Sequence, residues 1–85
     1  MNIRILYFAR LREEMGIAQE MFDLPQAAGD VKSLRAQLFA RGGAAAVAFA
    51  PGKAVRVSVN QDLAREDTPV KAGDEIAFFP PVTGG

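Results

Sequence analysis

The N-terminal residues alternate along the chain in a way that predicts a β-strand. Successive side chains of a strand point to opposite faces. Residues 3–8 divide accordingly into two sets, Ile3, Ile5 and Tyr7 on one face and Arg4, Leu6 and Phe8 on the other. The second face is apolar at Leu6 and Phe8, so these two side chains are expected either beneath a covering element or on a surface that meets a partner.

A short helix and a second strand are predicted next. Leu11 and Met15 lie four positions apart within residues 9–16, and Gly16 is placed to end that helix. Residues 17–24 alternate in part, which predicts a strand antiparallel to the first. The two strands then form a hairpin with a helical insertion.

The main helix is predicted over residues 31–40. Asp30 is a suitable N-cap, and one face of the helix is apolar, with Val31, Leu34 and Leu38. Gly42 and Gly43 are expected to end this helix, because either can adopt the left-handed backbone that helix termini favour.

The stretch after the main helix is ambiguous. The alanines of residues 44–53 favour helix, whereas Pro51 and Gly52 mark a turn. This stretch is therefore interpreted only as a variable connection.

Two further strands are predicted in the C-terminal half. Residues 54–60 alternate most regularly, with Val55, Val57 and Val59 on one face and Arg56, Ser58 and Asn60 on the other. The second strand covers residues 75–79, with Ile76 and Phe78 inward and Ala77 and Phe79 outward, and it ends at Pro80-Pro81 because proline cannot donate to a sheet ladder. Residues 61–75 are expected to form a long turn in which Leu63 and Val70 are the only large apolar residues.

The order strand, short helix, strand, helix, strand, long turn, strand predicts an α+β fold of the ubiquitin-like β-grasp kind. Its mixed sheet would pack on the one main helix. A chain of 85 residues has room for one core but not for an additional deep pocket. We therefore expect a single domain over residues 1–81, followed by an extended tail over residues 82–85.

Composition excludes most catalytic chemistry. The chain has no Cys and no His, so it lacks thiolate metal sites, a cysteine nucleophile and the usual general base near neutral pH. We expect no bound metal or cofactor, and no enzymatic activity from the chain alone. The formal net charge of +0 removes the broad attraction that nucleic acids or anionic membranes need. Without a signal peptide or membrane span, the chain is expected to be cytoplasmic.

The last residues form a stiff arm with a thin tip. Pro80-Pro81 and the β-branched Val82 and Thr83 favour an extended backbone, and Gly84-Gly85 has no side chains. Diglycine fits a tunnel too narrow for any Cβ atom, and its carboxylate would be the only reactive group of the tail. Such a group becomes an electrophile after adenylation by ATP, when a thiol or persulfide can attack the carbonyl. Flexible glycines without a function are the alternative interpretation.

Four segments of the chain form a recognisable set, namely "ILYFARLREEMG" at 5–16, "VSVNQ" at 57–61, "GDEIAFFPP" at 73–81 and "FFPPVTGG" at 78–85. Together they resemble the small-subunit family of molybdopterin synthase, the sulfur carriers of molybdenum-cofactor biosynthesis. The segment at 78–85 is the most specific. The resemblance covers nearly the whole chain, and it is weakest at residues 44–53.

The resemblance implies a set of partners and a role for the tail. An activating enzyme of the ubiquitin-activating type would use ATP to adenylate Gly85, and a sulfur donor protein would convert it to a thiocarboxylate. Thr83, Gly84 and Gly85 would then enter the active site of the large synthase subunit in a heterotetramer. There the sulfur would pass to a cyclic pyranopterin phosphate and form the dithiolene. The partner surface would include Phe8, Arg12, Leu63 and Phe79.

Other functions remain open from the sequence. A related β-grasp carrier could serve thiamine or thionucleoside synthesis, or act as a small protein modifier, and these share the diglycine and the adenylation. A non-covalent β-grasp binding module with an inert tail is a further alternative.

Overall fold

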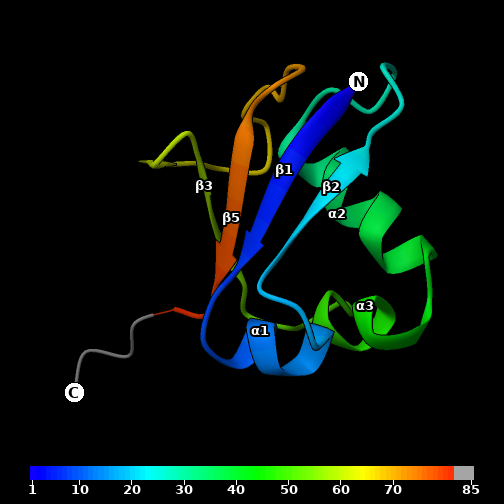
Figure 1. Cartoon of the computed structure of the whole chain (residues 1–85), viewed down its shortest axis with the longest axis vertical. Helices are drawn as coiled ribbons and strands as arrows, with labels where there is room; N and C mark the ends of the chain where they lie inside the picture. Colours follow the sequence, from blue (N-terminus) through cyan, green and yellow to red (C-terminus); the bar gives the residue numbers. More distant parts are fainter. Residues whose placement is uncertain (82–85) are drawn as a thin grey trace.

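The computed structural model describes residues 1–81, which form a five-stranded sheet and three helices (Figure 1). In chain order the elements are β1 (Asn2–Tyr7), α1 (Arg10–Met15), β2 (Gln19–Asp23), α2 (Val31–Ala40), α3 (Gly43–Ala48), β3 (Arg56–Val59), β4 (Asp62–Leu63) and β5 (Glu75–Phe79). The strand order is β2-β1-β5-β3-β4, with β1 parallel to β5 and the other neighbours antiparallel. This mixed sheet confirms the predicted α+β, β-grasp architecture.

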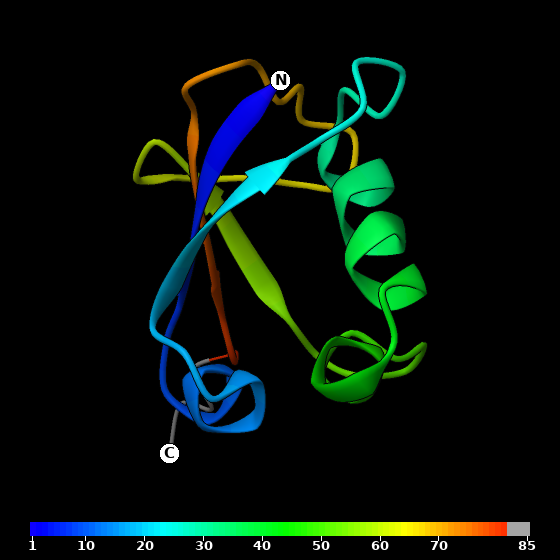
Figure 2. The same ribbon diagram turned by 45° about the vertical axis from the view of Figure 1, so that its right-hand side comes forward.

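The core lies between one face of the sheet and α2 (Figure 2). The alternation of the sequence selects the buried side chains correctly. Those of β1 and β5 are Ile3, Ile5, Tyr7, Ile76 and Phe78, and those of α2 are Val31, Leu34 and Leu38. Full burial of one such aliphatic side chain contributes about 1.5–3 kcal/mol relative to exposure, so these residues fix the register of the two central strands.

α2 begins and ends where the sequence predicted, and its N-cap is the predicted Asp30. The backbone N–H of Ser33 donates to Oδ1 of Asp30 at 2.8 Å, which satisfies one of the free amides of the first turn. At the other end the C-cap is Arg41, and Gly42 follows with φ +80° and ψ −169°. This positive-φ backbone is one that glycine allows, but it is not the left-handed helical form that was expected.

The ambiguous stretch 44–53 begins with a helix. α3 buries Ala45 and Ala48 and packs against α1 and α2. Phe49 follows it into the core. The helical propensity of alanine was therefore the correct local signal, and the turn signal of Pro51-Gly52 applies only after the helix ends.

The prediction of a long turn over residues 61–75 is wrong at its start. β3 and β4 form a hairpin in which Ser58 pairs with Leu63, and Val59 with Asp62. The two loop residues Asn60 and Gln61 have φ +51° and +72°, and positive φ at both positions is what a type I′ turn requires. Without the glycine usual in such a turn, the hairpin signal was weak.

The rest of that segment lies along the start of α2. The backbone N–H of Val31 donates to the carbonyl of Thr68 at 3.1 Å, and that of Val70 donates to the carbonyl of Gly29 at 2.9 Å. Val70 is buried, so the segment completes the core beside the main helix.

Candidate functional site

The face of the sheet turned away from α2, here called the outer face, carries apolar side chains from several strands. The pairings place Leu6, Ala77, Ser58 and Leu63 in one row across β1, β5, β3 and β4. Leu63 is 65% exposed, whereas Ala77 is only 8% exposed because it is small and lies between larger neighbours. Ala77 therefore points to the outer face, as predicted, but its side chain is buried and not exposed to solvent.

Two phenylalanines extend this face toward the end of β5. Phe79 is half-buried and pairs with Arg56 of β3. Phe8 is 46% exposed, and its backbone N–H donates to the carbonyl of Phe78 at 3.1 Å. This bond continues the parallel pairing of β1 with β5, so Phe8 and Phe79 occupy neighbouring positions. We call Leu6, Phe8, Leu63 and Phe79 the apolar band.

Arg12, the fourth residue expected at a partner surface, lies on a different element. It is exposed on α1, which packs at the end of the sheet where β5 finishes (Figure 1). Ala9, which precedes this helix, has φ +53° and ψ −128°, a region that non-glycine residues rarely adopt. The structure thus groups Phe8, Leu63 and Phe79 on the outer face, and Arg12 lies beyond one end of that face.

An aromatic cluster on the core side of the sheet anchors the end of β5. The rings of Phe49 and Phe78 meet edge to face with centroids 4.8 Å apart, and the rings of Tyr7 and Phe78 lie 6.4 Å apart at 18°. Aromatic pairs at such separations are favourable beyond the area they bury. Phe79 and Pro80 therefore follow a firmly anchored residue. Sequence reasoning did not find the part played by Phe49, because it lies in the stretch that remained ambiguous.

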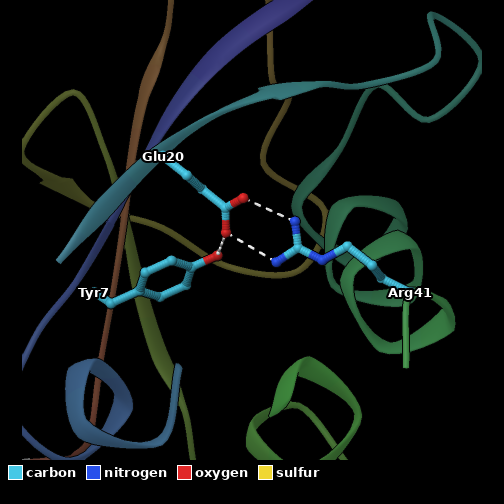
Figure 3. A network of polar contacts seen from close by, with 3 residues as sticks. All are labelled: Tyr7, Glu20 and Arg41. Carbon is cyan, nitrogen blue, oxygen red and sulfur yellow. Dashed lines mark hydrogen bonds and ion pairs between the residues drawn. The ribbon is translucent and has the colours of Figure 1, made fainter. Parts of the chain in front are cut away.

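A polar network ties the edge of the sheet to the end of α2 (Figure 3). The Tyr7 hydroxyl donates to Oε2 of Glu20 at 2.7 Å. Both terminal nitrogens of Arg41 donate to the same carboxylate, at 2.8 and 2.9 Å. The Arg41 guanidinium also lies 5.6 Å from the ring centroid of Phe22, within the range of a cation–π contact. Charge-assisted paired bonds of this kind are strong and geometrically specific.

This network holds its groups in their ordinary charge states. The hydrogen bonds from Arg41 lower the pKa of Glu20, which keeps it ionised near neutral pH. Burial, followed by the bond to Glu20, raises the pKa of Tyr7 above 10.0, which keeps its hydroxyl protonated. Neither group is therefore suited to proton transfer near pH 7. The role of the network is structural, because it joins the sheet edge to the end of α2.

Asn60 joins the β3–β4 turn to the start of β5. Its side-chain oxygen accepts from the backbone N–H of Glu75 at 3.0 Å, and its side-chain nitrogen donates to Oδ1 of Asp74 at 3.0 Å. Its backbone N–H donates to the carbonyl of Glu75 at 2.8 Å. The alternating pattern had placed Asn60 only on a solvated face. The signal that could have found this role is the tolerance of asparagine for positive φ.

The predicted tail begins where β5 ends. Pro80 and Pro81 are half-buried, and Thr83, Gly84 and Gly85 lie outside the described residues, so their role remains a prediction. Within residues 1–81 no helix is long and apolar enough to cross a membrane.

The order of the strands in the mixed sheet, with β5 in its centre leading to the tail, places the chain in the ubiquitin-like β-grasp class. The ThiS family model matches residues 5–85, and the chain belongs to this family. It is 42% identical over 86 residues to the molybdopterin synthase sulfur carrier subunit of Escherichia coli K12, covering 98% of this chain and 99% of that protein.

Two solved structures extend the comparison. SAMP1 from Haloferax volcanii has a TM-score of 0.79 and 25% identity, with full coverage of both chains. A chain of the complex of subunits 1 and 2 of the molybdopterin-converting factor from Helicobacter pylori has a TM-score of 0.66 and 28% identity, with 100% of each chain covered.

Proposed function

We propose that the chain is the sulfur-carrying small subunit of a molybdopterin synthase and is not catalytic alone. Its relative from Escherichia coli carries that name and matches over almost the full length. The structural observation that supports this function most directly is the arrangement at the end of β5. β5 ends with Phe78, whose ring is held by aromatic contacts, and with Phe79, which belongs to the apolar band. In the sequence these residues are followed by Pro80-Pro81 and then by the segment that contains the diglycine.

In the proposed reaction Gly85 is the carrier residue. Its carboxylate attacks the α-phosphate of ATP on an activating enzyme of the ubiquitin-activating type, and pyrophosphate leaves. A persulfide of a sulfur donor protein then displaces AMP from the acyl-adenylate and forms an acyl disulfide. A second thiol attacks the donor's sulfur in this S–S bond, so the thiocarboxylate leaves and a disulfide remains on the donor. The chain supplies the acyl group and its presentation, while the partner enzymes supply the catalytic groups. This division agrees with a sequence that has no Cys and no His.

The outer face is the proposed docking surface for the large subunit. Leu63 and Phe8 are exposed although both are large and apolar, and Phe79 lies beside Phe8 at the end of the band. Such side chains are typical anchors of an interface core. Arg12 would contact the partner from α1. Docking there would aim Thr83, Gly84 and Gly85 at the active site of the large subunit, as one half of a symmetric heterotetramer.

A reconstitution with intact-mass measurement tests the proposal. The purified chain is incubated with the adenylating enzyme of the same organism, ATP and a persulfide donor. We expect one oxygen to be replaced by sulfur and the change to map to the peptide that contains Gly85. Addition of the large subunit and cyclic pyranopterin phosphate should then return the carboxylate and yield the dithiolene. Failure to form the thiocarboxylate with any adenylating partner would favour a non-covalent binding module.

A second candidate is supported by the likeness to SAMP1. Thiocarboxylate formation without dithiolene formation would point to another acceptor, either a protein lysine or a precursor of thiamine or of a thionucleoside. Mass spectrometry of lysine-linked conjugates in cells would identify the modifier function.

A further inference from the structure

The arginines of the described residues separate into two groups. Arg10, Arg35, Arg41 and Arg65 each lie within 2.8–3.7 Å of a carboxylate. Within residues 1–81 no ion pair or side-chain hydrogen bond is recorded for Arg4, Arg12 or Arg56. Arg12 is already part of the proposed docking surface, and the other two lie on the outer face.

The sheet register places Arg4 one row before Leu6 on β1 and Arg56 in the same row as Phe79, so both arginines border the apolar band. Arg56 is the cross-strand partner of Phe79. Arg4 precedes Leu6 by two residues on β1, so the same alternation turns both to the outer face. Both arginines are exposed, and two surface hollows border Arg4, one with Gln19, Glu20 and Met21, and one with Met21, Asn60, Gly73 and Glu75.

The described carboxylates of the outer face form no ion pair with these two arginines. Asp23 belongs to the end of β2 and pairs with the amino terminus at 3.1 Å. Glu75 is the cross-strand partner of Arg4, but no ion pair joins them. Among residues 1–81, Arg4 and Arg56 therefore share the outer face with Glu75 as a carboxylate that has no ion pair. A guanidinium binds a carboxylate through two parallel hydrogen bonds, and arginine is enriched at interface hot spots.

We propose that Arg4 and Arg56 are charged contacts of the docking surface, and that the large synthase subunit presents carboxylates opposite them, beside an apolar patch that receives the band. This inference rests on the proposed function and adds the chemistry that selects the partner. The two cations steer the encounter, because complementary charge at an interface acts mainly on the association rate.

The test is the association rate of the chain with the large subunit of the same organism, measured by stopped flow at increasing NaCl concentration. The double variant R4Q/R56Q should associate about 10-fold more slowly than wild type at 50 mM NaCl. The difference should fall to about 2-fold or less near 0.5 M, where the Debye length is only about 4 Å. The variant R4K/R56K keeps both charges and should associate within about 2-fold of wild type.

A matched control removes two cations of α2, which lies on the opposite side of the sheet from the outer face. Lys32 and Arg35 both belong to this helix, and Arg35 pairs with Glu66 at 3.4 Å on the surface, so K32Q/R35Q changes the net charge equally. It should associate within about 2-fold of wild type at each salt concentration. An equal slowing in both Gln variants would show an effect of net charge alone and overturn the inference.

Three other outcomes would also overturn the inference. If wild type binds and R4Q/R56Q associates at the same rate, the arginines do not contribute, while the proposed function stands. If only thiocarboxylate formation is slowed, the arginines serve the activating enzyme instead. If wild type does not bind the large subunit at any salt concentration, the proposed function fails as well, and that result is distinct from the first two.

Discussion

At the scale of single residues, Glu20 shows how one side chain can connect three elements. It accepts from Tyr7 of β1 and from Arg41 beyond α2 while lying on the edge strand β2. A charged side chain that points inward on an edge strand also discourages pairing with another chain. Here the charge is compensated, because the Arg41 guanidinium donates two hydrogen bonds to the carboxylate in addition to the one from Tyr7.

The pH dependence of stability should report this compensation. The pKa of Glu20 is lowered in the folded state from 4.5, so its contribution is fully present above that value and is lost as pH falls through the lower folded pKa. We expect E20Q to reduce the free energy of unfolding by about 1–2 kcal/mol at pH 7. The difference from wild type should shrink below pH 4.5 in urea titrations.

The comparison of wild type with E20Q removes the effect of Asp30, whose pKa is also lowered by its bonds to Ser33. Glu66 provides a matched control, because it pairs with Arg35 at 3.4 Å in an exposed position. E66Q should change the free energy of unfolding by less than about 0.5 kcal/mol at every pH. A difference between wild type and E20Q that does not vary with pH would contradict the assignment.

At the scale of secondary structure, β5 combines the core with the candidate docking surface. Ile76 and Phe78 point into the core, and Phe79 points to the outer face beside Arg56. A one-residue shift of register would exchange these faces. The aromatic contacts of Phe78 with Tyr7 and Phe49 oppose such a shift.

Replacement of Phe79 by Glu should separate binding from folding. Phe79 is only half-buried, so F79E should remain folded, but loss of an aromatic anchor should weaken the complex with the large subunit by at least about 30-fold. Calorimetric titration measures the affinity, and circular dichroism checks the fold. F39E is the control, because Phe39 is exposed on α2, away from the outer face. Equal weakening by both variants would place the interface elsewhere.

At the scale of the whole molecule, the described residues 1–81 form a five-stranded sheet with a hydrophobic core. The proposed chemistry, in contrast, depends wholly on the terminal residue. Stability and sulfur transfer should therefore respond independently to changes at the tip.

Deletion of Gly85 tests this independence. We expect the free energy of unfolding to stay within about 0.5 kcal/mol of wild type, as for surface changes that touch no core group, and dithiolene formation to be abolished because the reacting carbonyl is displaced. Reconstituted synthase provides the assay. One residue appended after Gly85 should have the same effect. Normal product formation by either variant would refute the carrier mechanism.

The sequence by itself determined the faces of the strands and the position of the main helix. Alternation over residues 3–8 and 75–79 identified the buried side chains of β1 and β5, and the Asp30 cap fixed the start of α2. It also predicted that Phe8 and Phe79 point outward. These features depend on residues a few positions apart in the sequence, and the spacing of their apolar side chains directly shows the period of a strand or a helix.

Only the tertiary structure decided which of these residues meet. The parallel pairing of β1 with β5 brings Phe8 beside Phe79, and the β3–β4 hairpin carries Leu63 onto the same face. The contacts of Glu20 join residues 13 and 21 positions away. No local pattern encodes such contacts, because strand order and helix packing depend on how the whole core closes. The same closure leaves Arg4 and Arg56 on the outer face without an ion pair among residues 1–81, a property that their types and positions in the sequence could not reveal.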